Sequence, residues 1–379
     1  MRWFCTLLFV SGMAGAPGCE SGSARPEPTP LRPPVSEVDH STGKQTYDKY
    51  CAPCHGLDLK GYVADHAPSL INQTFLETAT DDFLTKSIAL GRPGTSMPAY
   101  SKKLGGPLAD DQIASMVAYI RSNGPPAIAL APVGKGQAER GTALYNEYCK
   151  TCHGDTTVRG EAMHLANVQW QRIASDAFIR YAIEKGRPGT KMLGFGTVMK
   201  PAQLDDVVAY VRALGTGQTV SSLLPAPTGK EPLVINPKGG DPVWKVRDKK
   251  FVPVDEAARE LVAGKKMIII DARPPSDWMR VHIAGAVSIP YHELPKLDAI
   301  PKDVAVLAYC ACPHHLSGIV VDELAKRGHK KAYVLDEGIN LWHQKNYPVV
   351  AAPGVTAAPS NHGTGGDHSG HDHSGHNHP

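Results

Sequence analysis

The chain shows two contrasting patterns of apolar residues. Up to residue 215, apolar positions recur at helical spacing and predict helices over residues 42–50, 110–122, 139–148 and 202–214. Gly- and Pro-rich loops are expected between these helices. Small domains with so much loop bury too little apolar surface to be stable alone, so we expect a large apolar group in their core.

Beyond residue 242, short apolar runs alternate with amphipathic segments. We expect strands over residues 251–254, 266–271, 304–309 and 332–335, and helices over residues 255–262 and 317–326. Buried strands rich in β-branched residues that alternate with helices indicate a parallel sheet. This part of the chain is therefore expected to form an α/β domain.

The helical part repeats itself once. Tyr-Cys-x-x-Cys-His-Gly at residues 50–56 recurs 98 residues later, and Gly-Arg-Pro-Gly-Thr-x-Met at residues 91–97 recurs 95 residues later. We define residues 41–123 as the first repeat and residues 137–215 as the second repeat, with a linker at residues 124–136 between them.

Further segments complete the organisation: a linker at residues 216–242, a third domain at residues 243–351, and a His-rich tail at residues 352–379 that is expected to be disordered. Residues 1–19 are typical of an export signal, because a positive start precedes an apolar run too short to span a membrane and then small residues. Residues 20–40 form a Pro-rich tether. We expect a periplasmic protein, in which Cys19 is either a lipid anchor exposed by cleavage or a bystander.

The composition narrows the classes of function. The 40 Lys and Arg residues nearly balance the 37 Asp and Glu residues, which excludes a strongly basic protein that binds nucleic acid. Six of the 8 cysteines fall into three close pairs rather than into a disulfide framework. In two of these pairs, a His follows the second Cys directly.

The two Cys-x-x-Cys-His sequences indicate covalent haem attachment. Two thiols about one helical turn apart reach the two vinyl groups of one porphyrin, and the His that follows lies under the iron. A zinc site would need a fourth ligand, and a dithiol redox site would need a βαβ context. We therefore expect two haem c groups, haem 1 on Cys51, Cys54 and His55 and haem 2 on Cys149, Cys152 and His153.

Each repeat resembles the class I c-type cytochrome domain, which is all-α. The resemblance implies that a Met before the last helix is the second iron ligand, namely Met97 in the first repeat and Met192 in the second. Met199 aligns with Leu108 and is expected to pack in the core. His/Met ligation leaves no open position on the iron, which favours electron transfer. Residues 67–70 match a family stretch near the iron-binding His that the second repeat lacks.

The third domain resembles the rhodanese, or sulfurtransferase, domain. Asp-Ala-Arg at residues 271–273, His-Ile-Ala-Gly-Ala at residues 282–286 and the pair Gly338 and Trp342 follow the order of the family. The resemblance implies an active-site cysteine at Cys310, in a loop between a strand and a helix. Loop N–H groups favour a thiolate, which can take up a sulfane sulfur as a persulfide.

The loop after Cys310 departs from the family pattern. Six residues rather than five separate Cys310 from Ser317, and the only cations that the loop offers are His314 and His315. Cys312 adds an auxiliary thiol. Three interpretations stay open: Cys310 carries a persulfide that Cys312 resolves, the two thiols form a redox-active disulfide, or the domain is a docking module without catalytic activity.

The tail is rich in histidine. Clustered imidazoles suit Zn, Cu or Ni, and we expect a metal at His368, His371, His373, His376 and His378. The alternative is a solubilising tail that binds metal only adventitiously.

The sequence thus predicts a multidomain protein with two small all-α cytochrome c domains and an α/β rhodanese-like domain. We expect electron transfer coupled to sulfane sulfur chemistry, with a small sulfur compound as substrate and a redox protein as partner. The alternative is an electron carrier whose third domain is a non-catalytic docking module. A thiosulfate-oxidising enzyme with a Cys-ligated haem fits less well, because neither repeat has a spare Cys. A dihaem peroxidase fits less well because both repeats carry a suitable Met.

Overall fold

The computed structural model describes residues 40–62, 66–217, 219–311 and 314–357. The expected export signal, Cys19, Cys312 and the tail histidines lie outside the described residues. Within the described ranges, no helix combines the length and the apolar character that crossing a membrane requires.

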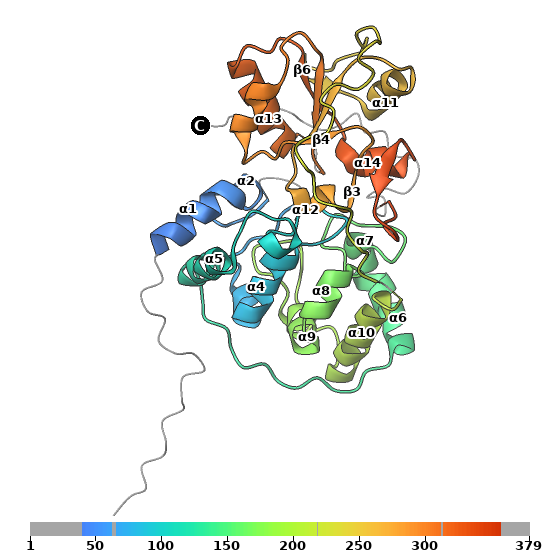
Figure 1. Cartoon of the computed structure of the whole chain (residues 1–379). Coiled ribbons are helices and arrows are strands. Elements are labelled where there is room, and N and C mark those ends of the chain that lie inside the picture. The colour runs from blue at the N-terminus through green and yellow to red at the C-terminus, as the bar shows by residue number, and fades with distance from the viewer. Residues whose placement is uncertain (1–39, 63–65, 218, 312–313, 358–379) are drawn as a thin grey trace, which may run out of the picture. The chain divides into compact units, whose positions relative to one another are not determined.

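Each repeat folds as a set of short helices (Figure 1). The first repeat contains α1 (His40–Tyr50), α2 (Ala52–His55), α3 (Gln73–Thr78), α4 (Asp81–Leu90), the 3₁₀ turn η1 (Lys102–Leu104) and α5 (Asp110–Ser122). The second repeat contains α6 (Ala138–Tyr148), α7 (Lys150–His153), α8 (Val168–Ile173), α9 (Asp176–Lys185) and α10 (Pro201–Leu214). The four helices predicted in these repeats are confirmed as α1, α5, α6 and α10.

A close crossing of the first and last long helices holds each repeat together. Helix α1 packs on α5, and α6 packs on α10. At the first crossing, a Cβ added to Gly43 would lie 2.4 Å from the carbonyl oxygen of Ser115. At the second, a Cβ added to Gly141 would lie 2.2 Å from the carbonyl oxygen of Asp206. Glycine is therefore needed at both positions to let the two backbones approach.

The segments between these helices are more helical than the sequence predicted. Helices α4 and α9 lie where we expected loops, and each has 10 residues. Each begins with a hydroxyl N-cap: Thr80 accepts the N–H of Phe83 at 3.0 Å, and Ser175 accepts the N–H of Phe178 at 3.1 Å. The prediction of loops was wrong because it followed the Gly and Pro residues that flank these segments, although Thr and Ser are typical N-cap residues of helices.

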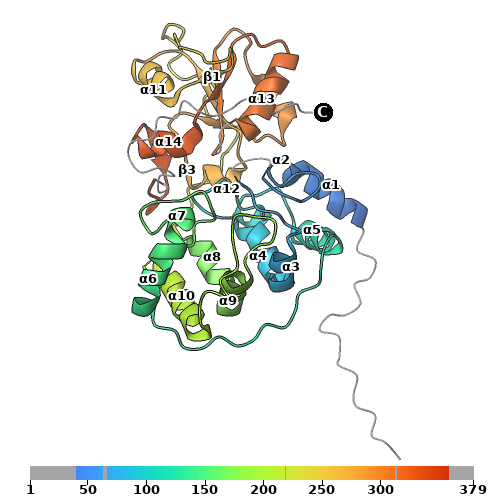
Figure 2. The ribbon, with the colours of Figure 1, turned by 180° about the vertical axis from the view of Figure 1, so that it is seen from behind.

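The two repeats share one apolar core. Within it, the rings of Phe83 and Phe178 stack with their centroids 4.7 Å apart. These residues are equivalent in the repeat, since they are 95 positions apart. Figures 1 and 2 show α4 of the first repeat beside α8 of the second. A contact between equivalent residues is typical of approximate twofold symmetry.

The third domain has a five-stranded sheet with the order β1-β6-β5-β2-β4, in which every neighbouring pair is parallel. Its strands are β1 (Phe251–Val252), β2 (Ile268–Asp271), β4 (Val287–Ser288), β5 (Val306–Tyr309) and β6 (Ala332–Leu335). Its helices are α11 (Val254–Val262), α12 (Pro275–Trp278), the 3₁₀ helix η2 (Leu294–Ala299), α13 (His315–Lys326) and α14 (Gly338–Gln344). The predicted parallel α/β fold is confirmed.

A second, two-stranded sheet was not predicted. It pairs β3 (Val281–Ile283) with β7 (Val349–Ala351) in antiparallel register. Each of these strands has 3 residues, which is too short for a clear alternation of apolar and polar positions.

The helix crossings can be tested by adding one methyl group. Gly43→Ala and Gly141→Ala should each lower the free energy of unfolding by about 1–3 kcal/mol, because the added Cβ overpacks the crossing. Gly318→Ala is a matched control, since nothing lies within 4 Å of a Cβ added at this position in α13. The control should instead gain up to about 1 kcal/mol from helix propensity. Denaturant unfolding followed by far-UV circular dichroism measures all three variants, and equal stabilities would contradict the assigned crossings.

Candidate haem and sulfur sites

The first haem-attachment sequence forms a short helical turn. Cys51 is the N-cap residue of α2, and Cys54 and His55 belong to that helix. The side chain of Cys51 is buried in the shared core, with its Sγ 3.3 Å from the Sδ of Met116. The hydroxyl of Tyr47 donates to the carbonyl of the residue after His55 at 2.7 Å, which closes the turn.

A hydrogen bond fixes the tautomer of His55. Its Nδ1 lies 2.9 Å from the carbonyl oxygen of Pro68. A carbonyl oxygen only accepts, so Nδ1 carries the proton and Nε2 keeps its lone pair. Burial lowers the pKa of His55 below its ordinary value, which further favours the neutral imidazole. His55 therefore has the form that a metal ligand requires.

The second attachment turn, in α7, repeats this arrangement with a different partner. The hydroxyl of Tyr145 donates to the carbonyl of Gly154 at 2.7 Å. The Nδ1 of His153 donates to the carbonyl of Met163 at 2.8 Å. Met163 thus does through its backbone what Pro68 does in the first repeat. Nothing in the sequence marks this partner, because any residue type can supply a carbonyl.

The two methionine loops have the same hydrogen-bonded turn. The N–H of Arg92 donates to the carbonyl of Met97 at 2.7 Å, and the N–H of Arg187 donates to that of Met192 at 2.9 Å. Both methionines are half-buried. Met199 is buried, with 4% of its surface exposed, as expected for a packing residue.

The donor groups of both repeats fit covalent haem c. Each turn offers two thiols about one helical turn apart and an imidazole with the correct tautomer, and each repeat adds a thioether on a loop. When bound, haem supplies one-electron redox chemistry. The chain's own contribution is to attach, orient and cover it.

Cys310 lies directly after β5 and before α13, the position that the sequence predicted. It is fully buried, and its Sγ lies 3.4 Å from the Oγ of Ser317. Its carbonyl accepts the N–H of Ile339 at 2.9 Å. The cysteine is therefore fixed between the end of the central strand and the first turn of the following helix.

The loop imidazole is bound to a carboxylate. The Nε2 of His314 lies 2.5 Å from the Oδ1 of Asp336, and Arg247 donates to the other carboxylate oxygen at 2.8 Å. Burial raises the pKa of Asp336, but the hydrogen bonds from His314 and Arg247 outweigh it and hold the pKa below its ordinary value. Asp336 is thus ionised at neutral pH and accepts hydrogen bonds from both side chains. His315 is buried in the first turn of α13.

The third domain contacts the first repeat beside the haem-attachment turn. The carbonyl of Tyr50, the residue before Cys51, accepts the hydroxyl of Tyr100 at 2.9 Å and that of Tyr291 in the third domain at 3.3 Å. Burial raises the pKa of Tyr291, and the two attachment thiols are close enough to add to the rise. The ring of His292 meets that of Tyr50 edge to face, with centroids 5.3 Å apart.

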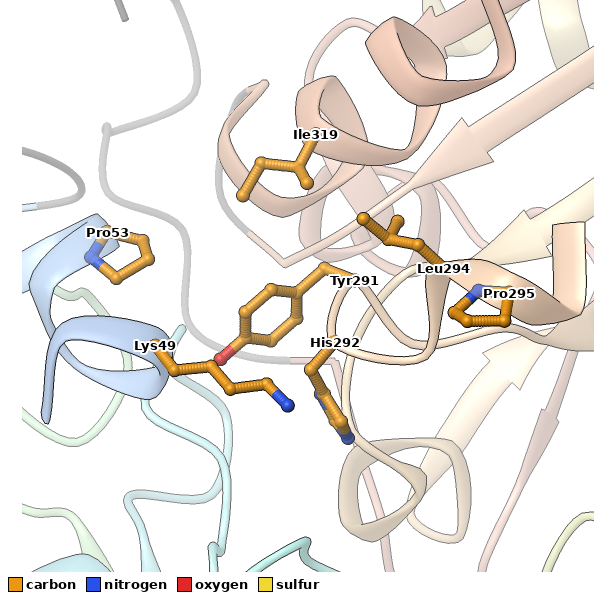
Figure 3. Close-up of a pocket in the computed structure, with 7 residues that line it drawn as sticks. All are labelled: Lys49, Pro53, Tyr291, His292, Leu294, Pro295 and Ile319. Carbon is orange, nitrogen blue, oxygen red and sulfur yellow. The ribbon is translucent and has the colours of Figure 1, made fainter. Parts of the chain in front are cut away.

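A pocket of about 340 Å³ opens at this contact (Figure 3). Its lining comes from both sides: Lys49 at the end of α1 and Pro53 in the attachment turn, and Tyr291, His292, Leu294, Pro295 and Ile319 from the third domain. Ile319 belongs to α13, the helix that follows the Cys310 loop. The attachment turn of the first repeat and the helix of the sulfur site thus line the same pocket.

A second contact reaches the methionine loop of the first repeat. Ser276, in α12, is buried and donates its hydroxyl to the carbonyl of Ala99 at 2.7 Å. Ala99 is two residues after Met97. The third domain therefore contacts the first repeat on both sides of its expected iron site. Sequence reasoning missed Tyr291 and Ser276, because nothing in a single sequence shows which domains touch.

In the part of the chain that the structure describes, no three His, Cys, Asp or Glu side chains gather in a way that could hold a metal ion. The histidines of the tail are not among these residues.

Family models match all three domains. Residues 38–120 and 136–211 match the model described as cytochrome C oxidase, cbb3-type, subunit III. The first two domains are therefore c-type cytochrome domains, which hold haem c covalently and transfer electrons. Residues 254–345 match the rhodanese-like domain. The chain is a dihaem cytochrome c joined to a rhodanese-like domain, as its sequence predicted.

The curated relatives match the cytochrome part. The cbb3-type cytochrome c oxidase subunit FixP of Bradyrhizobium diazoefficiens is 28% identical over 197 residues, which cover 49% of this chain and 64% of that protein. Subunit CcoP of Azospirillum sp. (strain B510) is 30% identical over 195 residues, which cover 46% and 62%. The chain thus spans less than two thirds of the length of these relatives.

Among solved structures, a rhodanese-related protein from Thermoplasma volcanium is 24% identical to this chain. The match covers 27% of this chain and 97% of that protein, with a TM-score of 0.24. A score this low adds nothing to the fold assignment, which stands on the sheet order and the family model.

Proposed function

We propose that this chain is an exported dihaem electron carrier whose rhodanese-like domain binds sulfane sulfur on Cys310 and passes electrons to haem 1. In the first repeat, the iron is ligated by His55 and Met97, and the porphyrin is held by Cys51 and Cys54. In the second repeat, the iron is ligated by His153 and Met192, and the porphyrin is held by Cys149 and Cys152. The substrate is a small sulfur compound, and the electron acceptor is a redox partner protein.

The first step is a sulfur transfer without net oxidation. The Cys310 thiolate attacks the outer sulfur of a donor such as thiosulfate, and a bond forms between its Sγ and that sulfur. The S–S bond of the donor breaks, and sulfite leaves with the electron pair of that bond. Cys310 then carries a persulfide. The hydroxyl of Ser317, 3.4 Å from Sγ, is placed to donate to the thiolate.

Electrons are released when the outer persulfide sulfur is oxidised to sulfite. The persulfide and three water molecules give the Cys310 thiolate, sulfite, six protons and four electrons. Haem supplies one-electron chemistry when bound, so the groups held by the two attachment turns would carry these electrons singly, and the redox partner would take up all four.

The contact between the sulfur-site domain and the attachment turn supports this coupling. The carbonyl next to Cys51 accepts hydroxyls from both Tyr100 and Tyr291, so the third domain is seated against the haem 1 site. A haem held by Cys51, Cys54 and His55 would lie beside the third domain, which supports the first repeat as the place where electrons enter.

A second function has an observation in its favour. Cys310 has no exposed surface, and a sulfur donor meets its thiol only if the loop opens. An electron carrier whose third domain docks a partner protein, without catalysis, needs no such opening.

The remaining parts of the proposal come from the sequence. Residues 1–19 direct export to the periplasm, Cys19 carries a lipid that tethers the protein to a membrane, and the tail histidines from His368 to His378 bind Zn, Cu or Ni.

The axial ligands are tested by their spectrum. Met97→Ala and Met192→Ala should each remove about half of the long-wavelength charge-transfer band that Met–iron bonding gives the oxidised protein, because each variant frees one of two irons. Met163→Leu and Met199→Leu are the controls, since one acts through its carbonyl and the other packs. An unchanged band in both alanine variants would refute the ligand assignment.

The sulfur site is tested by mass spectrometry of the full chain after treatment with thiosulfate. We expect the mass to rise by one sulfur atom, a gain that disappears in Cys310→Ser and persists in Cys312→Ser. Serine matches cysteine closely in shape, so the fold should be kept, and far-UV circular dichroism checks this. A loss of two hydrogens in untreated protein would indicate a Cys310–Cys312 disulfide instead, and no change under either condition would leave the docking function.

A further inference from the structure

The methionine loops lie at the contact between the two repeats. The guanidinium of Arg187 lies over the rings of Phe75 and Phe178, at 5.9 and 5.4 Å, and that of Arg92 lies over Phe83 at 6.0 Å. Both arginines belong to the Gly-Arg-Pro-Gly-Thr-x-Met sequences. Phe75 belongs to the first repeat, so Arg187 reaches across the contact, whereas Arg92 and Phe83 lie in the same repeat.

Two asparagines make the same hydrogen bond across this contact. The Nδ2 of Asn72, in the first repeat, donates to the carbonyl of Pro188 at 2.8 Å. The Nδ2 of Asn167, in the second repeat, donates to the carbonyl of Pro93, also at 2.8 Å. The two donors are 95 positions apart, and so are the two acceptors. Each asparagine thus holds the methionine loop of the other repeat.

The same asparagines also begin a helix in their own repeat. The Oδ1 of Asn72 accepts the N–H of Phe75 at 3.3 Å and caps α3. The Oδ1 of Asn167 accepts the N–H of Trp170 at 3.2 Å and caps α8. One side chain therefore uses its oxygen within its repeat and its amide nitrogen across the interface.

Thr74 adds a further bond on one side of the interface. Thr74 is buried, and its hydroxyl donates to the carbonyl of Gly186 at 2.8 Å. Gly186 lies two residues before Pro188. The loop that carries Met192 is thus bound at two successive places by the first repeat.

We propose that Asn72 and Asn167 are positioning residues that act across the interface. Asn72 keeps Met192 in place for haem 2, and Asn167 keeps Met97 in place for haem 1. The strength of each Met–iron bond then depends on the opposite repeat, which couples the two haem sites. This inference rests on the axial assignment of Met97 and Met192 made under the proposed function.

The variants Asn72→Asp and Asn167→Asp separate the two roles of each side chain. Aspartate keeps an oxygen for the helix cap but has no N–H to donate, and its charge repels the carbonyl across the interface. Asn123→Asp is the matched control, because Asn123 is the C-cap residue of α5 and its Nδ2 donates to a carbonyl of that helix, in the same repeat, at 2.7 Å.

The experiment is an imidazole titration of the oxidised full chain, since imidazole displaces a weakly held methionine from the iron. The methyl resonances of the two bound methionines, assigned with Met97→Ala and Met192→Ala, follow each site separately by NMR. The loss of one hydrogen bond should make displacement about five- to tenfold easier. We expect Asn72→Asp to change Met192 and leave Met97 within twofold, Asn167→Asp to do the reverse, and Asn123→Asp to change neither.

A merely structural role of the asparagines would not produce this pattern, in which each variant changes only the methionine of the opposite repeat. An effect on the methionine of the mutated repeat, an equal effect on both sites, or no effect would each overturn the proposal. Absence of both methyl resonances from the wild-type protein would overturn the axial assignment itself, and this inference with it.

Discussion

One hydrogen bond in each repeat, from the Nδ1 of a histidine to a backbone carbonyl, is the interaction on which both haem sites depend. It fixes the proton on Nδ1 and leaves Nε2 for the iron, so the tautomer is set before any haem is attached. The surrounding fold serves this arrangement. The crossing at Gly43 brings the last helix over the first, and the turn after it delivers two thiols and the imidazole together.

The contacts between domains differ for the two repeats and the third domain. The repeats meet through equivalent residues, so each methionine loop is braced by the opposite haem domain. The third domain contacts the first repeat beside its attachment turn and beside its methionine loop. The third domain thus breaks the approximate symmetry of the two repeats. Haem 1 and haem 2 would therefore have different neighbours, and we propose different places for them in the electron route.

The sequence predicted most of the fold and the residues that carry side-chain chemistry. The Cys-x-x-Cys-His and Gly-Arg-Pro-Gly-Thr-x-Met repeats, the long helices and the parallel sheet all have direct sequence signatures. Backbone partners have none, which is why Met163 was missed as the acceptor for His153. Contacts between domains are equally invisible, so the roles of Tyr291, Ser276 and the two interface asparagines emerged only from the structure. Helices α4 and α9 were missed although their caps at Thr80 and Ser175 could have been recognised.

The link between sulfur and haem is tested most directly by mixing the oxidised full chain with thiosulfate in the absence of oxygen and following haem absorbance. We expect that the wild-type haems become reduced and that Cys310→Ser stays oxidised. Dithionite should reduce both proteins fully, which shows that the haems of the variant are intact. Reduction of Cys310→Ser at the wild-type rate, or no reduction of the wild-type protein, would contradict the proposed coupling.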